Sequence, residues 1–147
     1  MRLENKTSIP ISLEDLLDRE YWIVERNALI RSKVKVYLDR LTGWKIAIRW
    51  KNGKRPFSGF CNPSKKLIAI SVNPKNTYPL TCRFTVGAKK DPDGYKYDFE
   101  TVTFNDAKDL VRFIFLHEFS HLLDYCRGLK MSFKQCKANR FAFANFK

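Results

Sequence analysis

Residues 105–128 read NDAKDLVRFIFLHEFSHLLDYCRG, and this stretch decides the fold because it predicts one long helix with a chemical motif in its middle. Asn105 or Asp106 suits the N-cap of that helix, and Gly128 suits the left-handed residue after its end. Apolar residues fall on nearly every side, so we expect the helix to lie inside a core. They are Leu110, Val111, Phe113, Ile114, Phe115, Leu116, Phe119, Leu122 and Leu123.

The motif is H-E-x-x-H, formed by His117, Glu118 and His121, and it uses the only two histidines of the chain. At about 100° per residue, positions 117 and 121 lie one turn apart on one helix face, so both imidazoles can reach one Zn²⁺. In metalloproteases with this arrangement the glutamate accepts a proton from the attacking water. Burying these polar groups is costly unless a metal compensates them. The alternative is a helix whose histidines bond backbone carbonyls while Glu118 reaches solvent.

A third metal ligand must come from another residue type, because a catalytic zinc usually has three protein ligands and an open position. Asp124 is the first candidate, three residues beyond His121; alternatively, it orients an imidazole or lies exposed near the helix end. Gln135 is the second candidate, at the start of a following helix that could return under the metal. Its amide is a weak ligand, and a helix-capping role is the alternative. Asn139, one turn later, is a further amide on that face.

Strand patterns precede the long helix. The segments alternate or are rich in β-branched and aromatic residues, and turn residues separate them. The predicted strands are 44–50, 66–72, 81–88 and 95–104, with turns at Asn52-Gly53 and at Asp91-Pro92-Asp93-Gly94.

Helices are predicted at both ends of the chain. Ser12 begins an S-x-x-D capping pattern, and apolar residues follow at helical spacing through Tyr21. Residues 33–37 alternate like a strand, but the segment up to a stop at Gly43 also suits a helix, which we prefer. Ser132 begins a second capping box, and the last helix should fold back on the long one.

The chain has 147 residues, of which 44% are hydrophobic and 14% aromatic, enough for one buried core. We expect a single α+β domain over residues 1–147, with an N-terminal helix or helices, three or four mostly antiparallel strands, the long motif helix and a C-terminal helix. No apolar run reaches 18 residues, and the N-terminus lacks the apolar segment of a signal peptide. These features predict a soluble, cytoplasmic protein without a membrane partner.

The cysteines match no C-x-x-C metal or redox spacing. Reduced, structural thiols are the simpler interpretation. Cys126 and Cys136 could meet across a helix hairpin, where they would form a disulfide or contact a metal. The four are Cys61, Cys82, Cys126 and Cys136.

The net charge of +13 is concentrated in one stretch. Residues 26–66 carry 12 basic groups and one acidic group, whereas residues 1–25 carry 3 basic and 6 acidic groups. Cations there alternate with aromatic residues, a mixture that neutralises phosphates and stacks on bases, so nucleic acid is a candidate partner. A solvated basic face is the alternative. The candidate nucleic-acid contacts are Arg49, Lys51, Lys54 and Arg55.

Residues 40–147 resemble the zincin-type metallopeptidases, and more narrowly their SprT-like and ImmA/IrrE-like branches. Segments 44–46, 59–61 and 67–71 look like the short meander before the SprT-like active-site helix, and residues 117–123 look like that helix. Residues 135–142, QCKANRFA, are similar to the E-x-x-A-N-x-F-A segment of the ImmA-like branch, whose Glu is the third zinc ligand.

The resemblance implies a zinc-dependent peptide hydrolase, with Gln135 standing where the ImmA-like branch has Glu. No later histidine is available as in the SprT-like branch. Zincins pair the substrate backbone with a strand at the edge of the cleft, and we expect the 81–104 hairpin to supply it. Together with the basic stretch, the resemblance suggests substrates associated with nucleic acid. The competing hypothesis is a nucleic-acid-binding or regulatory module on a zincin scaffold with an incomplete metal site.

Overall fold

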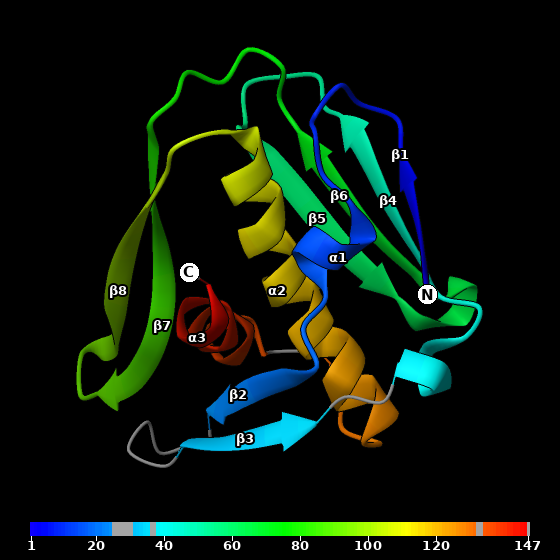
Figure 1. Cartoon of the computed structure of the whole chain (residues 1–147). Coiled ribbons are helices and arrows are strands. Elements are labelled where there is room, and N and C mark those ends of the chain that lie inside the picture. Colours follow the sequence, from blue (N-terminus) through cyan, green and yellow to red (C-terminus); the bar gives the residue numbers. More distant parts are fainter. Residues whose placement is uncertain (25–30, 36–37, 132–133, 147) are drawn as a thin grey trace.

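The long helix predicted from the sequence is α2, Ala107–Cys126, and it runs through the centre of the molecule (Figure 1). The computed structural model describes residues 1–24, 31–35, 38–131 and 134–146. Asp106 caps α2 by accepting a hydrogen bond from the Asp109 amide at 2.8 Å, and Gly128 follows the helix with φ +74°. Both predicted ends are confirmed. Asp106 and Gly128 suit these positions because they help to satisfy the backbone groups that a helix end leaves without partners.

A four-stranded sheet packs along one side of α2 (Figure 1). β1 and β6 run parallel to β4, and only β5 is antiparallel to its neighbour β6. The expectation of a mostly antiparallel sheet is therefore wrong, because pairing direction is set by long-range connections that local patterns do not encode. In spatial order the strands are β1 (Arg2–Asn5), β4 (Lys45–Trp50), β6 (Leu67–Val72) and β5 (Phe57–Asn62).

A long hairpin lies on the other side of the helices from this sheet (Figure 1). It consists of β7 (Leu80–Asp91) and β8 (Gly94–Phe104), with the turn where the sequence predicts it. The register shifts between Thr85 and Gly87, which marks a β-bulge. The predicted hairpin is confirmed, as are strands at 44–50 and 66–72 within one residue.

The N-terminal region contains less helix than predicted. α1 is a single turn, Leu13–Leu16, with the expected Ser12 capping box, and Tyr21 lies in a strand instead. β2 (Glu20–Val24) pairs with β3 (Arg31–Lys35) as a second hairpin. The preferred helix is thus wrong for the described part of 33–37, whose strand-like alternation forms β3; residues 36–37 lie outside the described ranges. A 3-10 turn, η1 (Leu38–Leu41), precedes β4, and a second one, η2 (Pro63–Lys65), connects β5 to β6.

The last helix, α3 (Gln135–Asn145), folds back against α2 as predicted (Figure 1). It begins at Gln135 with Lys134 at the N-cap and no side-chain cap, so it starts later than the capping box predicted. Ser132 and Phe133 of that box lie outside the described ranges.

The core forms where the sheet, α2, α3 and the β2–β3 hairpin meet. Tyr21 of β2 shows the arrangement, since its ring lies 5.0 Å from Phe119 of α2 and 5.7 Å from Phe141 of α3, between ring centres. All four cysteines are free thiols, so no disulfide joins Cys126 to Cys136. Among the described helices, none has the length and apolarity needed to span a membrane.

Candidate metal centre and active site

The two histidines of the motif come together on α2. His121 is buried and His117 is half-buried, and their ring centres lie 5.1 Å apart with the planes at 72°. Two imidazoles on one tetrahedral Zn²⁺, with bonds of about 2.1 Å, have ring centres roughly 5.4 Å apart. The spacing of the rings therefore fits a shared zinc ion.

Asn139 of α3 fixes the orientation of the first ring. Its Nδ2 donates to the Thr85 carbonyl at 2.8 Å, which leaves its Oδ1 to accept from His117 Nδ1 at 2.7 Å. His117 therefore carries its proton on Nδ1 and presents a bare Nε2, the form that ligates a metal. The sequence marked Asn139 only as an amide on this face, and its contact with β7 could not be read from local pattern.

Asn139→Ala is expected to weaken zinc binding about 10–100-fold, because such supporting contacts to ligand imidazoles are typically worth that much. Isothermal titration with Zn²⁺ measures the effect. Asn145→Ala is a matched control: this α3 asparagine also bridges to a strand, accepting from the Trp22 amide at 2.8 Å and donating to its carbonyl at 3.0 Å. An equal loss of zinc affinity in both variants would show that Asn139 acts only through helix packing.

Gln135 reaches both histidines from the first residue of α3. Burial lowers the pKa of His117 and of His121, and hydrogen bonding of each ring to the Gln135 amide oxygen, which favours the protonated ring, partly opposes this for both. In the described ranges no group of three or more His, Cys, Asp or Glu side chains is placed to hold a metal. Gln135 lines the same cavity as His117 and Glu118, which keeps its amide oxygen as a candidate third ligand.

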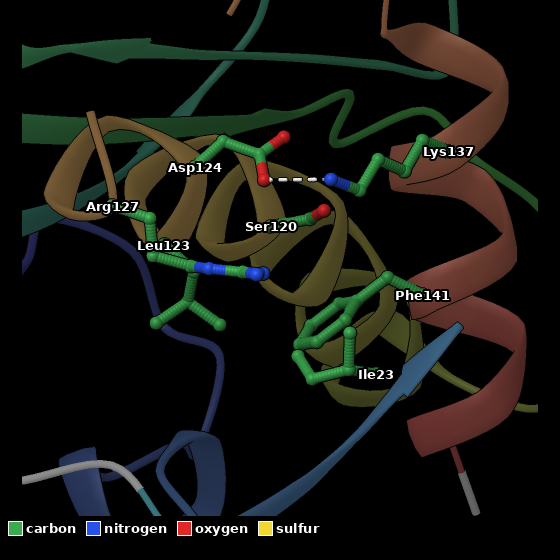
Figure 2. Close-up of a pocket in the computed structure, with 7 residues that line it drawn as sticks. All are labelled: Ile23, Ser120, Leu123, Asp124, Arg127, Lys137 and Phe141. Atoms are coloured by element: carbon green, nitrogen blue, oxygen red, sulfur yellow. Dashed lines mark hydrogen bonds and ion pairs between the residues drawn. The ribbon is translucent and has the colours of Figure 1, made fainter. Parts of the chain in front are cut away.

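Asp124, the first candidate for the third ligand, faces α3 (Figure 2). Its Oδ1 lies 2.9 Å from Lys137 Nζ, and its Oδ2 lies 3.9 Å from Lys134 Nζ. These ammonium groups compete with a cation for the same oxygens. The charge of Asp124 still raises the pKa of His121, though less than burial lowers it. In this structure the Asp124 carboxylate is thus engaged by Lys137 of α3.

The cavity beside Asp124 is too small for a substrate. Its volume is about 10 Å³, and Figure 2 shows the residues around it. Such a space holds one water at most. The lining residues are Ile23, Ser120, Leu123, Asp124, Arg127, Lys137 and Phe141.

Glu118 is a buried carboxyl next to the histidines. It is 6% exposed, and its Oε1 lies 3.8 Å from His117 Nε2. Burial raises the pKa of Glu118 from 4.5 to about 7. A carboxyl with that pKa can both accept and release a proton near neutral pH, as a general acid–base group must.

Burial of Glu118 should make the metal-free protein less stable as the pH rises. A raised folded-state pKa means that the folded protein keeps a proton which the unfolded chain releases between about pH 4.5 and pH 7. Glu118→Gln removes this loss. The free energy of unfolding of the variant should therefore exceed that of the wild type by up to about 3 kcal/mol near pH 8 and equal it near pH 4. Urea unfolding in the presence of a chelator measures the difference, and the histidine contributions cancel in it. An exposed control, Glu14→Gln, should show no such pH-dependent gain.

A cavity of about 290 Å³ opens beside Glu118 and His117. One side carries the polar groups of α2 and α3, and the other is aromatic. The Phe84 ring centre lies 4.8 Å from Phe113 and 5.9 Å from Phe57, which brings together β7, α2 and β5. The lining residues are Phe57, Gly59, Phe84, Phe113, Ile114, His117, Glu118, Gln135 and Asn139.

Gly59 lets strand β5 approach this cavity closely. A Cβ at that position would lie 2.8 Å from Ile114 Cγ2 and 3.3 Å from Glu118 Oε1, so a larger residue would displace β5 or the carboxyl. The sequence pattern does not mark Gly59, Phe57 or Phe84 as site residues, because only long-range contacts bring β5 and β7 to α2.

The free strand edge at the cavity belongs to β5 rather than to the hairpin expected from the sequence. β5 is the last strand of its sheet, and its residues 58–60 are exposed. By contrast, β7 carbonyls beside the cavity are occupied: Thr85 O accepts from Asn139, and Val86 O accepts from Arg140 Nη1 at 2.8 Å.

The four cations predicted to contact nucleic acid lie at the end of β4 and in the loop that leads to β5. Arg49, Lys54 and Arg55 are exposed, whereas Lys51 is half-buried. Asn73 holds the loop by donating to the carbonyls of Gly53 at 2.8 Å and Arg55 at 3.1 Å. The loop ends at Phe57, which lines the cavity, so the cations and the cavity are neighbours in the chain. Positions 26–30 and 36–37 of the basic stretch lie outside the described ranges.

No family model, curated protein or solved structure matches this chain.

Proposed function

We propose that the protein is a zinc-dependent metallopeptidase with a zincin-like fold. His117, His121 and Gln135 hold Zn²⁺, and Glu118 is the acid–base residue. The observation that carries the proposal is that one imidazole, His117, lines a cavity together with the buried Glu118 carboxyl of raised pKa and the Gln135 amide. The second imidazole, His121, lies 5.1 Å from His117 between ring centres. Perturbed titratable groups that line a cavity are typical of catalytic sites.

The chemistry of the site is peptide hydrolysis. Bound zinc supplies Lewis acidity, which acidifies water and polarises a peptide carbonyl. Glu118 accepts a proton from water as the water oxygen bonds to the carbonyl carbon. It then gives that proton to the leaving nitrogen as the C–N bond breaks. Asn139 holds His117 in the ligating tautomer throughout.

The substrate is an extended segment that pairs with the free edge of β5. Edge-strand pairing binds any backbone, so the side-chain preference must come from the cavity. Phe57, Phe84 and Phe113 form its apolar wall, and they suit a large apolar side chain adjacent to the bond that is cut.

Peptides with Phe or Leu beside the cut bond should be hydrolysed with kcat/KM about 10–100-fold higher than peptides with Ala there, which is the usual range of discrimination by an apolar pocket. A pool of unstructured peptides, incubated with zinc-loaded protein and sequenced by mass spectrometry, measures this preference. Phe84→Ala should reduce the preference for Phe or Leu over Ala. Phe60→Ala, which changes an exposed ring on the other face of β5, should leave that preference unchanged. Cleavage without regard to neighbouring side chains would show that the aromatic wall does not contact substrate.

A second candidate function is a nucleic-acid-binding module on the same scaffold, with a metal site that is too weak to be occupied. The neutral amide at the third ligand position favours it, since amides bind zinc weakly, as do the exposed cations of the loop before β5. The two candidates differ in their response to substitution: a peptidase depends on Glu118, whereas a binding module depends on Arg49, Lys54 and Arg55. Peptidase activity together with loop binding would indicate substrates carried on nucleic acid.

A further inference from the structure

The outward face of the β7–β8 hairpin carries a ladder of exposed aromatic rings. Tyr95, Tyr97 and Phe99 alternate along β8, so they share one face of the hairpin. They are 63%, 54% and 47% exposed, and successive ring centres are 6.4 Å apart. A continuous row of apolar rings in water is a feature of interaction surfaces.

The pairing register of the hairpin places basic side chains on the outward face and the carboxylates of both strands on the opposite face. Opposed residues of an antiparallel pair share a face, so Lys90 lies beside Tyr95 and Arg83 lies beside Thr101 on the outward side. The Arg83 guanidinium is 4.2 Å from the centre of the Phe99 ring. The carboxylates of the two strands alternate onto the opposite face; they are Asp91, Asp98 and Glu100. The ladder is therefore bordered by cations and by no carboxylate of its own face.

The hairpin that carries the ladder packs against α2 and α3. The inward face of β7 packs through Phe84 against Phe113 of α2 and Phe143 of α3. Asn139 and Arg140 of α3 bond the bulge carbonyls, as described above. α3 packs against β7 on the face that carries Phe84 (Figure 1). The ladder lies on the opposite face of the hairpin, where its three rings are exposed. The hairpin that carries the ladder is therefore anchored to both helices at Phe84 and at the bulge.

We propose that this outward face binds single-stranded nucleic acid, with bases stacked on Tyr95, Tyr97 and Phe99 and phosphates near Arg83 and Lys90. Aromatic rings bordered by cations are the combination that holds single strands without regard to sequence. The 6.4 Å ring repeat exceeds the ~3.4 Å separation of stacked bases, so consecutive bases must unstack to engage consecutive rings. A single strand can do this, whereas a duplex cannot. The site is distinct from the loop that precedes β5, and it stands independently of peptidase activity.

Fluorescence anisotropy with a labelled oligothymidylate of about twelve nucleotides, within the usual site sizes, tests the proposal. The wild type should bind the single strand at least about tenfold more tightly than a duplex of equal length. The triple variant Tyr95→Ser, Tyr97→Ser, Phe99→Ser should weaken binding about 100-fold or more, and Tyr97→Ser alone about tenfold. Circular dichroism and thermal unfolding verify that the triple variant folds, which its exposed positions favour.

The matched control removes exposed apolar side chains at and just after the end of α2, Tyr125→Ser with Leu129→Ser, which are 50% and 40% exposed. This control should bind as wild type does. Three outcomes overturn the proposal: undetectable binding by wild type at low salt, binding that persists in the triple variant, or equal affinity for duplex and single strand. Sedimentation velocity adds a fourth. A wild-type dimer that becomes monomeric in the triple variant, without oligonucleotide binding, would show that the ladder is a contact between two copies.

Discussion

Glu118→Gln is expected to lower kcat/KM for peptide hydrolysis by about 10³-fold or more, near the upper end of what a general acid–base group contributes. The amide has nearly the shape of the carboxyl, so the packing beside Gly59 and Ile114 is kept. It cannot accept the proton of water at any pH, and so the loss should not be recovered by raising the pH. Continuous assay of a quenched fluorescent peptide, with zinc-loaded protein, measures the change.

The same variant must keep its metal for this result to be informative. Because Glu118 is not a proposed ligand, zinc content should match that of the wild type. Asp124→Asn, which alters the neighbouring carboxylate that pairs with Lys137, serves as a control and should lose far less activity. Full activity in Glu118→Gln would remove the residue from the reaction and with it the proposed mechanism.

Gln135→Glu is expected to tighten zinc binding by at least tenfold, since a charged oxygen replaces a neutral one at a divalent cation. The variant should fold well: position 135 is exposed and lies in the first turn of α3, where a negative charge is favourable. Competition with a zinc-binding dye measures the affinity. This gain is a more discriminating test than a loss, because misfolding cannot produce it.

A second substitution to Glu, at the next position, controls for the expected gain in zinc affinity. Cys136→Glu adds the same charge one residue later on α3, at a position that does not line the cavity, and it should change zinc affinity by much less. Equal tightening in both variants would indicate a general electrostatic effect. No tightening at Gln135→Glu would mean that this side chain does not reach the ion.

Local signals in the sequence predicted the central helix, its caps, the β7–β8 hairpin and the placement of His117, Glu118 and His121 on one helix. These features depend on residues within a few positions of each other. The predicted direction of strand pairing in the sheet was wrong, and the sequence pattern did not identify β1 and β5 as strands. β1 has only four residues, and β5 contains Gly59, which weakens a strand pattern; both form because of partners far along the chain.

The same distinction applies to the site. Gln135 was named from its position after α2, and the return of α3 does bring it to both histidines. Asp124 was named first because it shares a helix with the motif; in the structure its Oδ1 accepts from Lys137 at 2.9 Å, and its Oδ2 lies 3.9 Å from Lys134 Nζ. The aromatic wall of the cavity comes from three separate elements. No spacing along the sequence relates them, so only the tertiary structure identifies them.

Zinc stoichiometry tests the metal centre most directly. Elemental analysis of zinc-reconstituted, desalted protein should give one equivalent for the wild type and for Glu118→Gln and Asp124→Asn, and far less than one for His121→Ala. A wild-type protein that retains no zinc after reconstitution, or a His121→Ala variant that retains a full equivalent, would contradict the assignment of His117, His121 and Gln135 as the metal centre.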